Sequence, residues 1–426
     1  MNAARAYDVI IYGATGFTGQ LAAEHLARRF AGGSLSPKRF ALAGRSEAKL
    51  KLVREGLCQI SDKAKDIDLL VGDSTDETFL DDMCKKTSVV LSYVGPYFRY
   101  GVPLARAAVK RGTDLCDITG EANYQQVLVE ELHEEAKKKG STILTSCGYD
   151  SIPFDVGSHG LVRHLRSQQS EGDITVQACT GPAMGGVSGG TVDSAGSFVG
   201  AALTSHVLDP GFDPAKAGKE PFRAGQYHEA SGTWLATSVM ETVNQKVVYR
   251  TRGLLAEMFG ESFVFQQFTS TKTRMQCMAA NAAIGAITFA IRTHWIRNFL
   301  VNRGVLPKPG EGPSENMRKN GYMNEFLFGR IEDKGTGRVS TAAVHVKGTN
   351  GDPGYQLTSL MSLQAALTLS RKKELAAEMH QLGGVLTPGA CMGDLLWKEF
   401  NQLKGHPESG QVSFEIISDP SKVKVY

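Results

Sequence analysis

Residues 1–154 alternate short apolar runs with segments in which apolar side chains recur at the period of a helix. Six apolar runs predict strands at 8–12, 40–43, 67–71, 88–94, 115–118 and 142–145. Five segments between them predict helices at 17–30, 46–56, 76–86, 103–112 and 124–139. Because parallel strands need crossovers of this length, the pattern predicts an α/β fold with a doubly wound parallel sheet of the Rossmann type.

The alternation stops after residue 155. A Gly-rich stretch at 180–197 interrupts it, and three segments predict strands of an antiparallel sheet, at 246–250, 262–268 and 339–347. The last part of the chain contains a predicted helix at 355–371 and a predicted strand at 412–417. We therefore expect three parts, which are a Rossmann domain at 1–154, a mixed α+β domain at 155–345 and a C-terminal segment at 346–426 that returns to the Rossmann domain.

The composition is that of a globular protein without a nucleic-acid partner. Charged residues make up 21% of the 426 residues, the net charge is +3, and no run of Lys and Arg stands out. The seven Cys are scattered and show no C-x-x-C spacing, which indicates a reducing intracellular compartment. The chain enters its first predicted strand at about Tyr7, so we expect no signal peptide.

Residues 275–290 form an apolar, Ala-rich stretch with Arg292, Trp295 and Arg297 after it. The stretch is short and weakly hydrophobic for a membrane span. One interpretation is a buried helix or the wall of an apolar pocket. The other is a helix that contacts a membrane surface through 275–297, with the basic and Trp residues at its flank. The sequence leaves both interpretations open.

The turn between the first predicted strand and helix has the spacing G-x-x-G-x-x-G. Its first Gly permits a tight turn, its second lets the backbone approach a pyrophosphate, and its third lets the helix pack closely on the sheet. The helix N-terminus offers free N–H groups to the phosphates, so this context predicts a dinucleotide site. The residues of that site are Gly13, Thr15, Gly16, Phe17, Thr18 and Gly19.

The end of the second predicted strand indicates which dinucleotide binds. An NAD enzyme carries Asp or Glu there for the ribose 2′-hydroxyl, whereas this chain has Arg45 and Ser46. The Arg45 guanidinium suits a 2′-phosphate, and the Ser46 hydroxyl can add a hydrogen bond. We therefore expect NADP(H). Asp73, which follows the third strand, is either an adenine contact or a turn residue.

Ligands of an open α/β sheet lie beyond the carboxyl ends of its strands, which nominates the loops at 95–97, 117–121 and 148–153. The expected contacts to the nicotinamide ribose are Gly95, Pro96 and Tyr97. The candidate catalytic residues are Tyr97, Glu121 and Asp150, although capping and turn roles remain open for the acids. No Tyr-x-x-x-Lys pair stands where short-chain dehydrogenases need it. No His and carboxylate cluster has metal-ligand spacing, so we predict no metal site.

Six short motifs follow one another along the chain. They are GATGFTG at 13–19, AGRS at 43–46, VGPY at 94–97, DITGE at 117–121, CGYDSIP at 147–153 and GGVLTPG at 383–389. Together they resemble the motifs of the saccharopine dehydrogenase-like oxidoreductases over nearly the whole chain. The segment at 307–314 is most similar to that family's trans-acting enoyl reductases. The resemblance implies reduction of a carbon–carbon double bond on a carrier-bound lipid chain, with hydride from NADPH, in glycolipid synthesis.

Three functions remain open at this point. The first is an NADPH-dependent oxidoreductase that reduces an enoyl or other apolar acyl substrate. The second is a protein that binds NADP(H) at a lipid surface without catalysis. The third is a saccharopine-type amino-acid reductase, but its substrate carboxylates call for clustered Arg, which the nominated loops lack. The resemblance also implies a membrane, lipid-droplet or mitochondrial location, and a homodimer is a further expectation.

Overall fold

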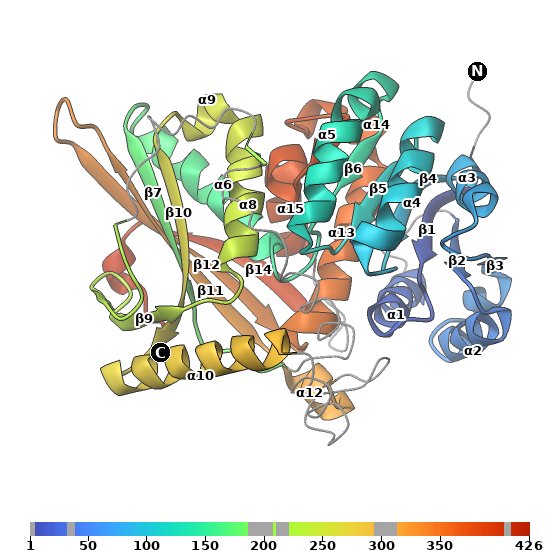
Figure 1. Cartoon of the computed structure of the whole chain (residues 1–426), viewed down its shortest axis with the longest axis horizontal. Coiled ribbons are helices and arrows are strands. Elements are labelled where there is room, and N and C mark those ends of the chain that lie inside the picture. The colour runs from blue at the N-terminus through green and yellow to red at the C-terminus, as the bar shows by residue number, and fades with distance from the viewer. Residues whose placement is uncertain (1–4, 32–38, 186–207, 210–220, 294–312, 404–409) are drawn as a thin grey trace.

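The computed structural model describes residues 5–31, 39–185, 208–209, 221–293, 313–403 and 410–426 (Figure 1). Within these residues the strands form two seven-stranded sheets that lie beside one another along the long axis of the molecule. The first, sheet A, is parallel throughout, and the second, sheet B, is mixed. The predicted class, a Rossmann sheet with a second mixed domain, is confirmed.

Sheet A has the strand order β13–β6–β5–β4–β1–β2–β3. Its strands are β1 (Tyr7–Tyr12), β2 (Phe40–Gly44), β3 (Asp68–Val71), β4 (Thr87–Ser92), β5 (Asp114–Asp117), β6 (Thr142–Leu144) and β13 (Gly384–Leu386). Val9, Ile10 and Ile11 are fully buried, as expected for a parallel strand that helices cover on both faces. The order reverses between β1 and β4, and this reversal creates the crevice in which such sheets bind their ligands.

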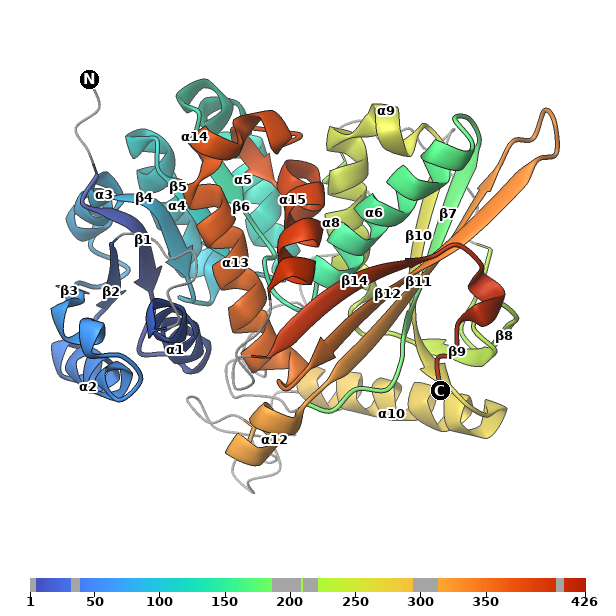
Figure 2. The same cartoon turned by 180° about the vertical axis from the view of Figure 1, so that it is seen from behind.

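Helices cover both faces of sheet A (Figure 2). The helices are α1 (Phe17–Ala31), α2 (Glu47–Cys58), α3 (Glu77–Lys86), α4 (Tyr97–Arg111), α5 (Ala122–Lys139) and α13 (Thr358–Ser370). Apolar side chains of α1, α2 and α13 share one core cluster, and those of α3, α4 and α5 share the other. Ser46 caps α2, because its hydroxyl accepts a hydrogen bond from the Lys49 amide.

Sheet B has the strand order β14–β12–β11–β7–β10–β9–β8. Its strands are β7 (Asp173–Thr180), β8 (Tyr227–His228), β9 (Thr233–Thr237), β10 (Phe263–Thr271), β11 (Met323–Glu332), β12 (Val339–Thr349) and β14 (Gln411–Ile417). The β7–β10 pair is parallel, and the other neighbours are antiparallel. Three helices pack against this sheet: α6 (Ile152–Gln168) lies on β11 and β12, α8 (Glu241–Leu254) on β10, and α15 (Pro388–Gln402) on α6 and β14.

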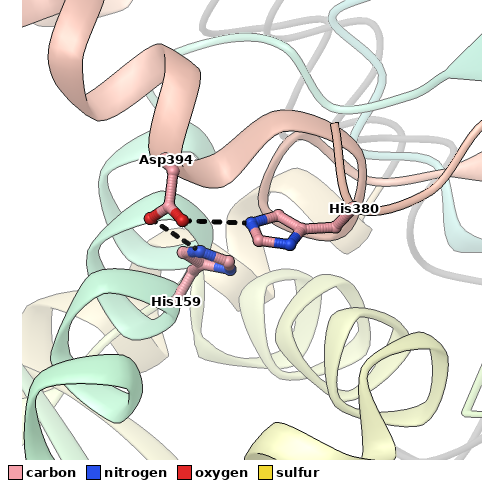
Figure 3. Close-up of side chains that lie close together, drawn as sticks. All are labelled: His159, His380 and Asp394. Carbon is pink, nitrogen blue, oxygen red and sulfur yellow. Dashed lines mark hydrogen bonds and ion pairs between the residues drawn. The ribbon is translucent and has the colours of Figure 1, made fainter. Parts of the chain in front are cut away.

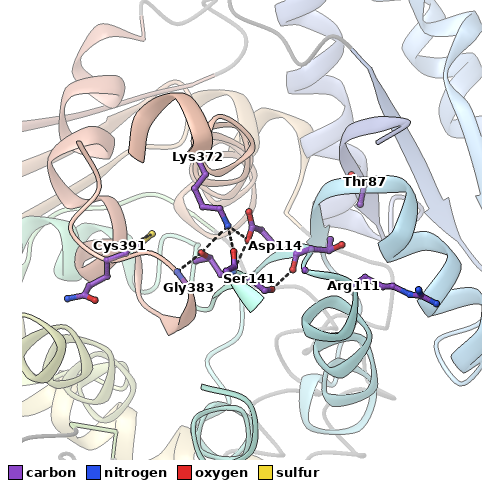
Figure 4. A network of polar contacts seen from close by, with 12 residues as sticks. Thr87, Arg111, Asp114, Ser141, Lys372, Gly383 and Cys391 are labelled. Carbon is purple, nitrogen blue, oxygen red and sulfur yellow. Dashed lines mark hydrogen bonds and ion pairs between the residues drawn. The ribbon is translucent and has the colours of Figure 1, made fainter. Parts of the chain in front are cut away.

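The C-terminal part of the chain contacts both sheets. Helix α13 packs on α1 and β4, and β13 extends sheet A by pairing with β6, while α15 packs on α6 and β14 pairs with β12. At the start of α14 (Lys372–Leu375), the Lys372 ammonium is bonded to the Asp114 carboxylate of β5 and to the Gly140 carbonyl at 2.8 Å (Figure 4). This ion pair fastens the segment to the amino end of β5 in the Rossmann sheet.

The remaining helices are the long surface helix α10 (Arg274–Arg292) and the short helices α9 (Ala256–Phe259) and α12 (Glu315–Asn320). Single turns occur at η1 (Asp62–Asp66), η3 (Pro353–Leu357), η4 (Ala376–Glu378) and η5 (Pro420–Lys422). The seven Cys are free, and all but Cys58 are buried. No helix among the described residues is both long and apolar enough to cross a membrane.

Two predicted elements are wrong. The expected strand at 246–250 lies inside helix α8, whose side chains from Val243 to Arg252 are all buried. A segment buried on every side carries no helical periodicity, and its Val247-Val248 pair imitated a strand. Helix α4 begins at Tyr97 rather than at Pro103, which sits in the helix interior.

Residues 275–290 form most of helix α10, and the interpretation as a buried helix is wrong. Its N-terminus is fixed by a capping box in which Thr273 and Gln276 bond reciprocally to backbone N–H groups. Cys277 is buried, but Met275 is 79% exposed and Phe289 is 65% exposed. The helix therefore lies on the surface with an apolar face turned outward. The rest of the expected contact, 294–297, lies outside the described residues, as do 186–197 and 307–312.

Candidate functional site

The predicted phosphate-binding turn joins β1 to α1. Gly13 has a φ of 83°, a conformation that side-chain-bearing residues rarely adopt, and its amide bonds to the Ala43 carbonyl of β2 at 2.9 Å. A Cβ on Gly19 would lie 2.3 Å from the Gly13 carbonyl oxygen. Only glycine thus allows α1 to start this close to the strand, and the helix presents its first N–H groups to the turn. The turn has the shape that a pyrophosphate needs.

The end of β2 lies beside this turn. A Cβ on Gly44 would lie 3.8 Å from the Thr15 hydroxyl, so the residues that follow Gly44 border the same turn. The Arg45 side chain is exposed there. Asp73 accepts hydrogen bonds from the Thr75 amide and hydroxyl, which lower its pKa, and nearby Arg45 lowers it further. Asp73 is therefore held in a turn within electrostatic reach of Arg45.

The expected ribose contacts, Gly95, Pro96 and Tyr97, lead from β4 into α4. Glu121 of the next loop accepts hydrogen bonds from the amides of Tyr97 and Phe98, both at 2.9 Å. The Glu121 carboxylate thus caps the N-terminus of α4, where its negative charge also interacts favourably with the helix dipole. The Tyr97 ring is buried, and its hydroxyl donates to the Ser92 carbonyl at 3.2 Å. Tyr97 and Glu121 thus both make hydrogen bonds that stabilise the local structure, and their catalytic role stays a prediction.

Behind this loop lies a buried acid that the sequence did not single out. Asp117, at the end of β5, accepts hydrogen bonds from the Tyr124 hydroxyl and the Thr119 amide, both at 3.0 Å. Burial raises its pKa to about 7, although these hydrogen bonds oppose the rise. The Asp117 carboxyl is enclosed by protein, and its hydrogen bond to the Thr119 amide holds the loop that carries Glu121.

A segment from the C-terminal part, residues 352–358, packs beside the phosphate turn. We call this segment, together with the side chains of Tyr149, Asp150 and Glu325, the rim of the cofactor turn. The Phe17 ring, at the start of α1, packs edge-on against the Tyr355 ring of η3 with 5.1 Å between centroids. The Asp352 side chain fixes this segment by accepting from the amides of Tyr355 and Gln356. Thr358 follows, and its hydroxyl accepts a hydrogen bond from the Tyr149 amide at 3.1 Å. The loop after β6 is thereby tied to the cofactor turn.

At this rim two elements of different sheets meet. The Tyr149 hydroxyl donates a hydrogen bond to Glu325 Oε1 on β11 at 2.7 Å. Glu325 is fully buried, and burial raises its pKa to about 8, while contacts with Tyr149 and Thr180 oppose the rise. Asp150, the third catalytic candidate, is open to solvent but enclosed by protein on its other sides, and this desolvation raises its pKa to about 6. The three side chains form an acidic cluster.

Glu325 was missed from the sequence alone. It stands between Asn324 and the apolar run Phe326-Leu327-Phe328. An acid in a buried strand is expensive unless it has a partner, so this pattern was the available signal.

Comparisons with known proteins agree with this geometry. Residues 9–144 match the family model described as the saccharopine dehydrogenase NADP-binding domain. A Mycobacterium tuberculosis protein provisionally named a trans-acting enoyl reductase is 33% identical over 416 residues, which cover 92% of this chain and 94% of that protein. The chain belongs to the saccharopine dehydrogenase-like oxidoreductase family. A trans-acting enoyl reductase of Mycobacterium ulcerans is 31% identical over 93% of this chain and 96% of its own length.

Among solved structures, the apo saccharopine dehydrogenase (L-Glu forming) of Saccharomyces cerevisiae superposes with a TM-score of 0.52. That alignment covers 96% of this chain and 99% of the yeast chain at 13% identity, so it shows a shared fold. Membership of the family makes the protein an NADP-dependent oxidoreductase, as the sequence motifs predicted. NADP(H) is its cofactor, and the Gly13–Gly19 turn and the exposed Arg45 fit its phosphates.

A second cluster of ligand-type side chains lies between α6 and α15 (Figure 3). His159 and His380 each place Nε2 3.2 Å from an oxygen of Asp394, and Arg163 Nη1 lies 2.6 Å from the same carboxylate. Metal-bound histidines usually donate their second N–H to an acceptor, but the buried His159 Nδ1 has no partner. Arg163 also already neutralises Asp394. These contacts explain the cluster as an Arg163–Asp394 ion pair with histidine hydrogen bonds to the same carboxylate, and the absence of a metal stays a prediction.

Proposed function

We propose that this NADP-dependent oxidoreductase reduces an enoyl or other apolar acyl substrate in lipid metabolism. The observation that carries the proposal is the chemistry of the rim around the cofactor turn. The polar groups that the described residues bring there are the phenol of Tyr149, the carboxyl groups of Glu325 and Asp150, and the hydroxyl of Thr358. None of these groups is a cation that would hold a substrate carboxylate, Asp150 with its pKa of about 6 carries a negative charge at neutral pH, and the phenol can supply a proton, which suits a neutral acyl chain better than saccharopine.

The surface helix α10 supports a lipidic source for the substrate. Its exposed side chains include Met275, Met278, Ile287 and Phe289, and no Asp or Glu occurs anywhere from 263 to 310. An apolar helix face with Lys and Arg at its flanks favours the surface of a membrane or lipid droplet that carries anionic headgroups. We propose this contact for the segment 275–297. A homodimer stays a prediction.

The substrate class is tested by following NADPH oxidation with trans-2-decenoyl-coenzyme A as the probe and identifying the product by mass spectrometry. We expect decanoyl-coenzyme A, with a kcat/KM that rises with acyl chain length because longer chains bury more apolar surface. The reverse assay offers saccharopine and NADP⁺ at the same protein concentration. Reduction of NADP⁺ by saccharopine, with no reduction of the decenoyl probe, would overturn the proposal.

A further inference from the structure

We infer that Tyr149 and Glu325 form a proton-delivery pair, in which the Tyr149 hydroxyl meets the substrate and Glu325 restores its proton. The inference rests on the proposed reduction of a conjugated double bond. Such a reduction adds a hydride to one carbon and a proton to its neighbour. NADPH supplies the hydride when it is bound, so the chain itself must supply the proton.

The position of Tyr149 is the first support. The residue follows β6 at the carboxyl edge of sheet A, where ligands of such sheets lie. Its amide is bonded to Thr358, three residues after Tyr355, which packs on Phe17 of the cofactor turn. Tyr149 packs against the core, and the residue as a whole is partly exposed. Tyr149 is thus a partly exposed residue that is anchored near the cofactor turn.

The pairing with Glu325 is the second support. The bond from the Tyr149 hydroxyl to Glu325 Oε1 is 2.7 Å, an ordinary distance between neutral partners. The second oxygen, Oε2, is buried without a hydrogen bond of normal geometry, and the Thr180 hydroxyl is the polar group that contacts the carboxyl besides Tyr149. A buried carboxylate with an unpaired oxygen is costly, whereas a protonated carboxyl group is tolerated. The raised pKa of Glu325 agrees, since a value of about 8 leaves most of this group protonated at pH 7. Glu325 is a proton store.

A route to solvent is the third support. Asp150 is the next residue after Tyr149, is open to solvent, and raises the pKa of both Tyr149 and Glu325 through its charge. The other groups near Glu325 are the Thr180 hydroxyl and the buried Cys179 thiol of β7, whose pKa the Glu325 charge raises. Asp150 is therefore the group of this cluster that can exchange protons with water.

The reaction balances with these groups. Hydride addition to C3 of a 2-enoyl thioester forms a C–H bond and moves the π electrons to the carbonyl oxygen as an enolate. The enolate takes the Tyr149 proton at C2, and the electron pair of the O–H bond stays on the phenolate. The Glu325 carboxyl group then turns its O–H to the phenolate and is reprotonated from water through Asp150. The substrate is reduced, NADPH is oxidised, and one solvent proton is consumed.

Three single substitutions test the pair in the full-length chain. Tyr149→Phe removes the proton donor, and Glu325→Gln removes the store but keeps the shape. Tyr322→Phe is the matched control, because it also removes one phenol hydroxyl, from the residue just before β11. Turnover of trans-2-decenoyl-coenzyme A, the NADPH dissociation constant and the solvent deuterium isotope effect are measured for each variant. Infrared spectra of the ligand-free protein report the C=O band of a protonated carboxyl group.

We expect Tyr149→Phe to lower kcat by about 100-fold or more, as removal of a general acid does, with NADPH affinity within twofold of wild type. Glu325→Gln should lower kcat about tenfold, raise the solvent isotope effect and remove one carboxyl band at pH 7. Tyr322→Phe should behave as wild type. Turnover of Tyr149→Phe within threefold of wild type, or an unchanged carboxyl band in Glu325→Gln, would overturn the inference. A wild-type protein that binds NADPH but leaves the probe unreduced contradicts the proposed function instead. In that case the infrared carboxyl band still shows whether Glu325 is protonated.

Discussion

Replacement of Arg45 by Ala tests the basis of the NADPH preference. The side chain stands at the end of β2 beside the cofactor turn and is exposed, so the substitution removes no buried packing. A guanidinium can donate two hydrogen bonds to a phosphate, and this contact exists with NADPH but not with NADH. The variant should therefore lose affinity for the phosphorylated cofactor alone.

The size of the loss follows from the exposure of Arg45. A hydrogen bond to a charged group contributes about 1.5–3 kcal/mol, and solvent screening favours the lower half of that range at an open site. At about 1.4 kcal/mol per tenfold change, NADPH should bind about 10- to 50-fold more weakly. Arg45→Lys keeps the charge without the planar fork and should lose less. Added salt should narrow the difference between wild type and Arg45→Ala.

Isothermal titration calorimetry with NADPH and NADH measures both dissociation constants. Lys49→Ala is the control, because it removes a cation from the same region of α2, and we expect it to change either constant by less than twofold. The reasoning is refuted if Arg45→Ala weakens NADPH and NADH equally, since the 2′-phosphate would then have another partner.

Three further predictions follow from charges and exposed surface. The pKa of Glu325 is about 8 in the folded protein and 4.5 ordinarily, so this group makes the fold less stable as the pH rises from 4.5 through 8. Glu325→Gln should therefore flatten the fall in melting temperature over that interval. An unchanged slope would contradict the raised pKa. Lys372→Met should destabilise the fold by about 3 kcal/mol in urea unfolding at pH 7, because it leaves buried Asp114 unpaired, and a loss below 1 kcal/mol would refute this. Met278→Glu with Phe289→Glu should release the protein from anionic liposomes in flotation, whereas the double variant would float like wild type if α10 makes no lipid contact.

A control for the liposome experiment comes from another exposed apolar side chain. Leu52 on α2 is 65% exposed, like the apolar residues of α10, but it lies on the Rossmann domain. Leu52→Glu should leave flotation unchanged, which separates a local contact from a general effect of net charge.

The sequence allowed the cofactor domain to be predicted because its signals are local. The strand at 8–12, the Gly turn and Arg45 follow one another within 45 residues, and each constrains the next through short-range geometry. The second domain was harder. Helix α8 is buried on every side, so it lacks the polar stripe that distinguishes a helix from a strand. For helix α10 the sequence left a buried and a surface position open, and the structure places it at the surface.

The acidic cluster shows what local pattern cannot supply. Tyr149 and Asp150 were visible as polar groups in a nominated loop, but Glu325 lies 176 residues beyond Tyr149. Their contact depends on the register of β11 against β7, in which Glu325 stands opposite Thr180. It also depends on Thr358 at the start of α13, which holds the loop after β6 in place. Neither arrangement leaves a mark in a single sequence. The buried acid itself was the observable sign, and it needed the structure to find its partner.

The most direct measurement is the fate of deuterium in one turnover. NADPH deuterated at C4 of the nicotinamide is mixed with excess protein and trans-2-decenoyl-coenzyme A in ordinary water, and the product is analysed by mass spectrometry. The account predicts decanoyl-coenzyme A with one deuterium at C3 from the cofactor, and in heavy water with ordinary NADPH one deuterium at C2. The experiment is run twice, with the deuterium at each of the two C4 hydrogens of the nicotinamide in turn. A decenoyl probe recovered unchanged, or a product without deuterium at C3 in both runs, would contradict the account.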